Sequence, residues 1–261
     1  KSILLIALLF FVVSTIISSV IYSLTPKIAV VPIKGEITSE SEDSIFGSSA
    51  VSSRQVAETL RTLKDDSSVK AIIIDINSPG GSPVASEEIS LAIEEVSKEK
   101  PVYAYIGDMG ASGGYWVAVS ADKVYASKLS LVGSIGVTSA GLGFEDFIKQ
   151  YNITYRREVA GKYKDIGSVW REPTEEENEM IREILKDMHT EFINHIATSR
   201  NLTIEEVKPY AEGQIYLGSK AVELKLIDGV SDYNSVVNEL RNVTDSENAI
   251  VVNYLQDKYQ F

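Results

Sequence analysis

The sequence lacks cysteine entirely and contains only two histidines, His189 and His195, among its 261 residues. The absence of cysteine excludes thiol proteases, disulfide-stabilised domains, and zinc or iron–sulfur centres with cysteine ligands. Any histidine base or multi-histidine metal site would have to use the two histidines that are present. We predict a protein without a metal centre and without a cofactor.

Basic residues are also few, since 25 Lys and Arg stand against 37 Asp and Glu and leave a formal net charge of −12. Phosphate contacts in nucleic-acid complexes are made mainly by Lys and Arg, so this balance argues against nucleic-acid binding. Hydrophobic residues form 44% of the chain and charged residues 24%, which excludes wholesale disorder and allows a packed core. The length is that of one or two domains.

Charge is absent from the segment Ser2–Leu24, which reads SILLIALLFFVVSTIISSVIYSL. At about 1.5 Å per residue, a helix of this length is roughly 35 Å long and can cross the hydrocarbon core of a bilayer. A cleaved signal peptide is the alternative, but its apolar stretch is about 7–15 residues long and precedes a small-x-small cleavage site. The exit, IYSLTPK, has no such site. We predict a transmembrane anchor over residues 1–25 and a separate domain over residues 26–261.

After Pro26 the apolar pattern alternates between strand-like and helix-like segments. A run rich in β-branched residues predicts a strand buried on both faces over Lys70–Ile76. Further strands are predicted over Lys27–Ile33, Val102–Ile106 and Lys123–Ala126. Helical spacing predicts helices over Arg54–Lys64, Glu87–Lys98, Gly113–Ser120 and Thr174–Ser199. Residues 36–49 are rich in serine and acidic residues, and we expect a mobile loop there. The alternation predicts an α/β fold of βαβ units with a largely parallel sheet.

Two clusters of small residues follow predicted strands. Asn77–Ser82 (NSPGGS) has adjacent glycines whose N–H groups can approach a ligand closely, although an ordinary Pro-Gly turn explains the same pattern. In Asp108–Trp116 (DMGASGGYW), Ser112 stands where a helix begins, and free N–H groups there favour developing negative charge. Ser112 is therefore a candidate nucleophile, and a simple helix cap is its alternative role.

The third cluster, Ala160–Ser168 (AGKYKDIGS), carries two lysines in a loop. A serine nucleophile needs a base, and both histidines fall among apolar positions of the helix predicted over residues 174–199. We expect these histidines to be helix-face residues. A lysine can serve as the base only if burial disfavours its charged form, because a free lysine has a pKa of about 10.4. A solvated surface loop is the alternative interpretation of this cluster.

In their order and spacing, these clusters resemble the S49 family of serine proteases of the signal peptide peptidase A type. The resemblance covers nearly the whole chain and corresponds to the short, single-unit form of that family. The matching features are the apolar N-terminus, the strand followed by NSPGG, M-x-A-S-G-G-Y, V-G-S-I-G-V over Val132–Val137, and G-x-Y-K-D-I. The fold that the resemblance implies is crotonase-like and is shared with Clp-type proteases.

The resemblance also implies a role for each matching residue. Ser112 would be the nucleophile and Lys164 the general base. Ser134 would orient the lysine amine, and the N–H groups of Gly81 and Gly113 would form the oxyanion hole. We also predict that substrate is bound at the neighbouring residues Gly80, Ile135, Gly136 and Val137.

The activity implied by the resemblance is that of a membrane-anchored endopeptidase with its catalytic domain outside the cytoplasm. Its substrates would be cleaved signal peptides and other unfolded apolar peptides. In short-form members the lysine reaches the serine of a neighbouring subunit, so we expect a homo-oligomeric, octamer-like ring. Tyr115 and Trp116 would add apolar surface beside the nucleophile, and packing in the core is their alternative role.

Other functions fit parts of the same pattern. A stomatin-operon-type membrane protease also pairs serine with lysine on this fold, whereas a crotonase-type acyl-CoA enzyme needs neither residue. A catalytically silent membrane scaffold is the non-enzyme alternative. Three N-x-T sequons, at Asn152, Asn201 and Asn242, are potential glycosylation sites if the domain lies outside the cell.

Overall fold

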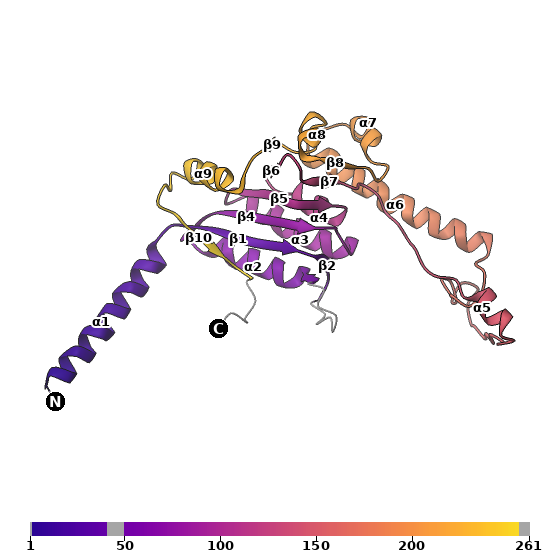
Figure 1. Cartoon of the computed structure of the whole chain (residues 1–261), viewed down its shortest axis with the longest axis horizontal. Helices are drawn as coiled ribbons and strands as arrows, with labels where there is room; N and C mark the ends of the chain where they lie inside the picture. The colour runs from indigo at the N-terminus through magenta and orange to yellow at the C-terminus, as the bar shows by residue number, and fades with distance from the viewer. Residues whose placement is uncertain (1, 41–49, 256–261) are drawn as a thin grey trace.

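The computed structural model describes residues 2–40 and 50–255, and its centre is an eight-stranded sheet (Figure 1). The strand order is β10-β1-β4-β5-β6-β9, with β7 pairing β5 and β8 pairing β7. All of these pairings are parallel except that between β7 and β8. The predicted α/β architecture with a largely parallel sheet is therefore confirmed. The strands are β1 (Lys27–Lys34), β4 (Val69–Ser78), β5 (Val102–Ala111), β6 (Lys123–Ala126), β7 (Leu131–Gly133), β8 (Ile215–Leu217), β9 (Gly229–Val230) and β10 (Ile250–Asn253).

The central strand β4 explains why the sheet is covered on both faces. Its isoleucines alternate, so that Ile72 and Ile74 join one core cluster while Ile73 joins the other. All three side chains are completely buried. Such a run has no solvent-facing side, which is typical of a parallel strand between two helical layers.

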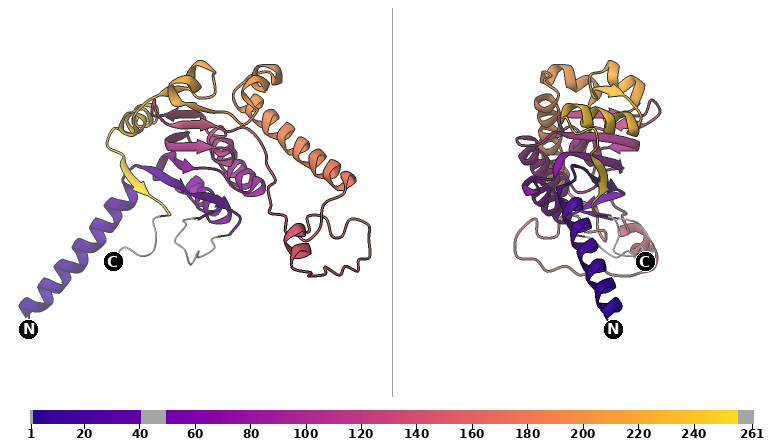
Figure 2. Two further views of the ribbon diagram at one scale, coloured as in Figure 1. Left: turned by 45° about the vertical axis from the view of Figure 1, so that its right-hand side comes forward. Right: turned by 90° about the vertical axis from the view of Figure 1, so that its left-hand side faces the viewer.

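Helices form a layer on each side of the sheet (Figure 2). The first layer consists of α2 (Ser53–Asp65), α3 (Pro83–Ser97), α4 (Gly113–Ala118) and the C-terminal half of α6 (Glu175–Ser199). On the other face lies α9 (Tyr233–Val243), which packs Val236, Val237 and Leu240 against the sheet. The remaining short elements are α5 (Glu145–Gln150), α7 (Ile204–Val207), η1 (Lys208–Tyr210) and α8 (Gly218–Glu223).

Part of the segment predicted to be a mobile loop over residues 36–49 is a strand. β2 (Glu36–Thr38) pairs in parallel with β3 (Ala50–Ser52), and Ile37 also forms a bridge to Gly81. The buried Ile37 side chain stabilises this small sheet against the core, which the polar composition of the segment did not indicate. Residues 41–49 lie outside the described part of the chain.

A long excursion separates β7 from α6, and we call residues 139–173 the arm. It carries α5 and extends away from the sheet beside the N-terminal end of α6 (Figures 1 and 2). The arm is described throughout and contains no strand, so the lysine cluster lies in a long loop, as predicted. Thr174 and Glu177 form a reciprocal capping box where α6 begins, within one residue of its predicted start.

The N-terminal helix α1 extends over Ser2–Leu24 and stands away from the sheet (Figure 1). Its side chains are described from Leu9 onward, apart from position 19, and the large apolar ones are exposed. Among the described residues, no helix combines the length and the apolar character needed to cross a bilayer. The anchor over residues 1–25 stays a prediction.

Candidate functional site

Ser112 occupies a strained junction between β5 and α4. Its backbone angles, φ 50° and ψ −123°, lie in a region that residues with a side chain rarely adopt. The conformation is held by its N–H, which donates to Gly133 O at 2.8 Å, and by its carbonyl, which accepts from Tyr115 and Trp116 at 2.9 Å. The hydroxyl makes no capping hydrogen bond although Ser112 stands at the N-cap position. The helix-cap alternative therefore does not account for this serine.

Two glycines of the NSPGGS segment lie directly beside Ser112. A Cβ atom on Gly80, where φ is 104°, would come within 2.8 Å of Ser112 Cβ and 2.7 Å of Gly113 N. A Cβ on Gly113 would lie 3.3 Å from Gly81 N, so the backbones of Gly81 and Gly113 are in close contact. Within the described part of the chain, neither the Gly81 nor the Gly113 N–H has a hydrogen-bond acceptor. Two adjacent free donors next to a serine hydroxyl can stabilise an oxyanion.

Two clefts meet at Ser112. The larger has a volume of about 480 Å³, and the smaller has a volume of about 160 Å³. The larger cleft is lined by Ser112, Ser134, Gly136, Val137, Thr138, Leu185, Lys186, His189, Ala211, Glu212 and Gly213. The smaller is lined by Gly81, Pro83, Ser86, Ser112, Gly113, Trp116, Gly136, Val137, Thr138, Met188 and Phe192. The larger cleft has a mixed polar and apolar lining, whereas the smaller cleft is lined mainly by apolar side chains.

The V-G-S-I-G-V segment contributes to both clefts, though not through every predicted residue. Ser134 lines the larger cleft with Ser112, and its φ of 53° is held by an N–H that donates to Gln214 O at 2.7 Å. Gly136 and Val137 line both clefts. The Ile135 side chain is fully buried in the core, and Ile135 lines neither cleft.

Lys164 is not brought to Ser112 within one chain. It lies in the arm, is exposed, and lines neither of the clefts that contain Ser112. Its backbone N–H donates to Gly161 O at 3.1 Å, and its ammonium has no partner in the described part of the chain. The lysine that does line the Ser112 cleft is Lys186 on α6. The sequence does not single out Lys186, because a lysine on a charged helix face carries no distinguishing signal.

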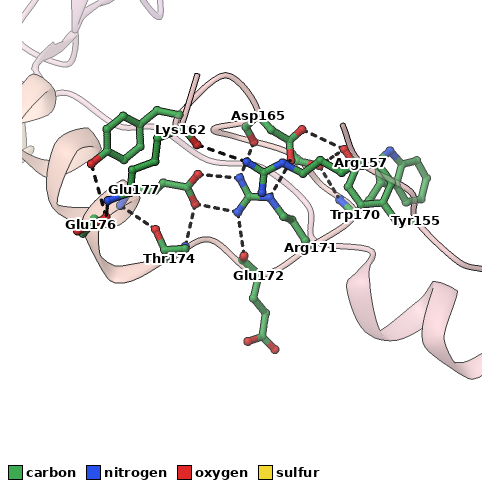
Figure 3. Close-up of polar contacts among 12 residues, drawn as sticks. Tyr155, Arg157, Lys162, Asp165, Trp170, Arg171, Glu172, Thr174, Glu176 and Glu177 are labelled. Carbon is green, nitrogen blue, oxygen red and sulfur yellow. Dashed lines mark hydrogen bonds and ion pairs between the residues drawn. The ribbon is translucent and has the colours of Figure 1, made fainter. Parts of the chain in front are cut away.

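A cluster of charged groups holds the arm to the start of α6 (Figure 3). The Arg171 guanidinium donates to Asp165 Oδ2 at 2.8 Å and to the two Glu177 oxygens at 2.7 and 2.8 Å. Arg171 and the Thr174 N–H hold the pKa of Glu177 well below its ordinary 4.5, at about 2. Lys162 forms an ion pair with Glu176, so the two lysines of the arm differ in their surroundings. The cluster fixes the turn that carries Lys164.

Replacing Arg171 by alanine is expected to loosen the arm without unfolding the sheet. The side chain of Glu177 is only 4% exposed, and the substitution leaves its charge without the bidentate partner. We expect roughly tenfold faster amide hydrogen exchange in residues 140–173 and little change in β4 and β5. The matched control is Arg182→Ala, because Arg182 forms an exposed ion pair with Glu175 on the same helix.

The same loosening is expected in acid. The pKa values of Asp165 in the arm and of Glu177 in α6 are lowered in the folded protein. The stabilising effect of both carboxylates is therefore complete above the ordinary carboxyl pKa. It is lost as the pH falls from about 4.5 towards the folded value of about 2. Amide protection in the arm, taken relative to the intrinsic exchange rate at each pH, should fall over this range. Protection that stays constant, or that is equal in wild type and Arg171→Ala, would contradict this account.

The aromatic residues after Ser112 have different environments. Tyr115 is completely buried and donates from its hydroxyl to Leu226 O at 2.6 Å, so its predicted role in substrate surface is wrong. Burial raises the pKa of this hydroxyl. Trp116 lines the smaller cleft. The histidines also differ, because His189 lines the larger cleft with its Nε2 2.6 Å from Ala211 O, whereas His195 lies against Trp116.

Comparisons with known proteins agree with the motifs of this site. Residues 94–247 match the model of peptidase family S49. The chain is 30% identical over 236 residues to a putative signal peptide peptidase SppA of Enterococcus faecium, covering 90% of this chain and 69% of that protein. It is 34% identical over 212 residues to a putative protease of Methanocaldococcus jannaschii, covering 81% and 68%. It is 29% identical over 190 residues to the chloroplastic serine protease SPPA of Arabidopsis thaliana, covering 72% and 28%.

Proposed function

Because this chain belongs to peptidase family S49 and is a serine protease, we propose that it is an endopeptidase with a Ser-Lys dyad. Ser112 is the nucleophile in this proposal, and Lys164 of a neighbouring copy is the general base. The observation that carries the proposal is the strained Ser112 next to the free N–H groups of Gly81 and Gly113, where two clefts meet.

The proposed reaction proceeds through an acyl-enzyme. Ser112 Oγ attacks the peptide carbonyl carbon while its proton passes to the neutral lysine amine. The oxyanion accepts hydrogen bonds from the Gly81 and Gly113 N–H groups, which need no rearrangement to receive it. The C–N bond then breaks as the lysine returns the proton to the leaving amine. Water cleaves the ester by the same proton path and regenerates Ser112.

A lysine from another subunit accounts for the distance between Lys164 and Ser112 in one chain. A lysine can accept a proton only in its neutral form, which burial favours and exposure to water does not. Lys164 is exposed in the single chain, so it becomes a base only when a neighbour covers it. Ser134, at the wall of the larger cleft, would then hydrogen-bond the incoming amine. We propose a homo-oligomeric, octamer-like ring, and free protomers should be nearly inactive.

Membrane attachment through α1 is part of the proposal. The segment Ser2–Leu24 contains no charged residue, and apolar side chains such as Phe10 and Leu24 are about three-quarters exposed, at 76% and 75%. A globular domain rarely leaves such a series of side chains in water, so a lipid environment is a fitting partner. The catalytic domain would lie outside the cytoplasm, next to the bilayer.

The substrates that we propose are signal-peptide remnants and other unfolded apolar peptides. One relative is named a putative signal peptide peptidase, and the smaller cleft beside Ser112 is walled by Trp116, Met188 and Phe192. A cleft of about 160 Å³ suits a small or medium apolar side chain. An extended peptide would also pair its backbone with a strand edge, which is largely independent of sequence.

A panel of peptides matched in length should therefore be cut after alanine or leucine. A charged side chain in the smaller cleft would lose its hydration and find no partner there. We therefore expect kcat/KM for a peptide with a charged residue before the cut to be lower, by about 100-fold or more, than for the alanine or leucine peptide. The assembled full chain is assayed by mass spectrometry of the products, with a folded protein as control. Preference for a charged residue before the cut, or ready digestion of the folded protein, would argue against these substrates.

A serine-reactive fluorophosphonate tests the proposed function directly. We expect the probe to form one covalent adduct on the assembled wild-type chain, on the tryptic peptide that contains Ser112, and none on Ser112→Ala. An acyl-CoA enzyme or a silent scaffold with the same fold would not be labelled at this residue. A stomatin-operon-type protease would be labelled too, and the peptide panel separates it by substrate preference.

A further inference from the structure

Trp116 forms one wall of the smaller cleft, one helical turn beyond Ser112. Its backbone N–H donates to the Ser112 carbonyl at 2.9 Å. Its indole Nε1 is buried and has no hydrogen-bond partner in the described part of the chain. No hydrogen bond therefore holds the ring in place, and the orientation of this wall depends on what the indole packs against.

The ring of His195 lies flat against the indole. The two ring centroids are 4.4 Å apart and the planes meet at 14°, which is a stacked arrangement. Phe192, one turn earlier on α6, lies 5.1 Å from Trp116 by ring centroids and lines the same cleft. Two side chains of α6 thus hold the indole, and His195 has the closer and more parallel contact.

The His195 ring is itself held in place by polar partners of its Nε2 atom. Its Nε2 lies 3.1 Å from Trp116 O, and because a carbonyl oxygen only accepts, Nε2 carries the proton in this bond. The hydroxyls of Ser120 and Ser90 approach the same nitrogen at 3.2 and 3.4 Å. Ser90 belongs to α3, whereas Trp116 lies in α4 and Ser120 directly follows it, so two separate segments of the chain hold the imidazole. Burial lowers the pKa of His195, although the hydrogen bond to Trp116 and the negative charges of Glu94 and Glu87 act in the opposite direction.

We propose that His195 is a positioning residue that sets the width of the smaller cleft by holding Trp116. In this way it selects the size of the substrate side chain before the scissile bond. The inference rests on the proposed function of Ser112, since it concerns the cleft next to that nucleophile. His195 contacts neither Ser112 nor the cleft itself in the described structure, so its effect passes through the indole.

The test uses peptides that carry phenylalanine or leucine before the cut, with kcat and KM measured separately on the assembled full chain. His195→Ala frees the indole to move, and we expect the ratio of kcat/KM for phenylalanine to that for leucine to rise roughly tenfold. His195→Phe keeps a flat ring against Trp116 and should restore the wild-type ratio. Arg182→Ala changes an exposed residue of α6 that lines neither cleft, and it should leave the ratio unchanged.

A double-mutant cycle shows whether His195 acts through Trp116. If it does, the phenylalanine-to-leucine ratio of kcat/KM is the same in His195→Ala/Trp116→Ala as in Trp116→Ala, because without the indole the loss of His195 has no further effect on the cleft. The chain has two tryptophans, so in a Trp170→Phe background the fluorescence reports only Trp116, and His195→Ala should shift its emission.

The outcomes separate this inference from the proposed function. An unlabelled Ser112 in the wild-type assembly contradicts the proposed function. Labelled Ser112 with an unchanged phenylalanine-to-leucine ratio in His195→Ala overturns the positioning role alone. The positioning role is also overturned if His195→Ala lowers kcat/KM equally for both peptides. The same holds if the effects in the double-mutant cycle are additive or if the Trp116 emission is unchanged.

Discussion

Replacing either Ser112 or Lys164 by alanine is expected to abolish peptide hydrolysis, with a loss of about 10⁴-fold or more in kcat. Ser112→Ala removes the atom that forms the acyl-enzyme, and Lys164→Ala removes the group that accepts its proton. Both positions are at least partly exposed, so neither change creates a core cavity. Folding and assembly should be intact by circular dichroism and analytical ultracentrifugation. The double variant should be little worse than either single one, because nucleophile and base act as a unit.

Two other lysines are the matched controls. Lys162 lies two residues before Lys164 and is paired with Glu176, so Lys162→Ala should have a mild effect. Lys186 is the sharper control, because it lines the Ser112 cleft within the same chain. If Lys164→Ala is fully active and Lys186→Ala is inactive, the general base is Lys186 of the same subunit and the proposed role of Lys164 is wrong.

Mixing two inactive variants is expected to restore activity. If Lys164 serves the Ser112 of a neighbour, an interface between a Ser112→Ala protomer and a Lys164→Ala protomer can contain both native groups. In a closed ring with random equal mixing, about a quarter of the sites are intact, so activity should recover to roughly a quarter of wild type. The variants are mixed under conditions of subunit exchange, and hydrolysis is followed over time.

The exchange itself needs an independent measurement. Fluorescence energy transfer between differently labelled protomers reports mixed assemblies, and activity should appear at the same rate. Verified exchange without recovered hydrolysis would show that nucleophile and base belong to one chain. Protomers diluted below the assembly concentration should lose activity in parallel with the transfer signal.

The sequence by itself determined the parallel sheet and the part of the site that contains Ser112 and the N–H groups of Gly81 and Gly113. Runs such as Lys70–Ile76 can be buried on both faces only in a sheet with two helical layers, and the structure has this arrangement. NSPGGS and GASGG each follow a strand, and the carboxyl ends of neighbouring parallel strands meet at one edge. Gly81, Ser112 and Gly113 therefore come together from local sequence alone.

Only the tertiary structure decided which side chains complete the clefts. Trp116 and His195 are 79 residues apart, and no local pattern distinguishes the stacked Trp116 from the fully buried Tyr115 before it. Lys186 and His189 line the larger cleft because the C-terminal half of α6 packs beside α4. The separation of Lys164 from Ser112 has the same origin. The spacing of apolar residues in the sequence indicates which face of a helix is apolar. The direction of the helix and the residues that it contacts depend on packing between distant segments.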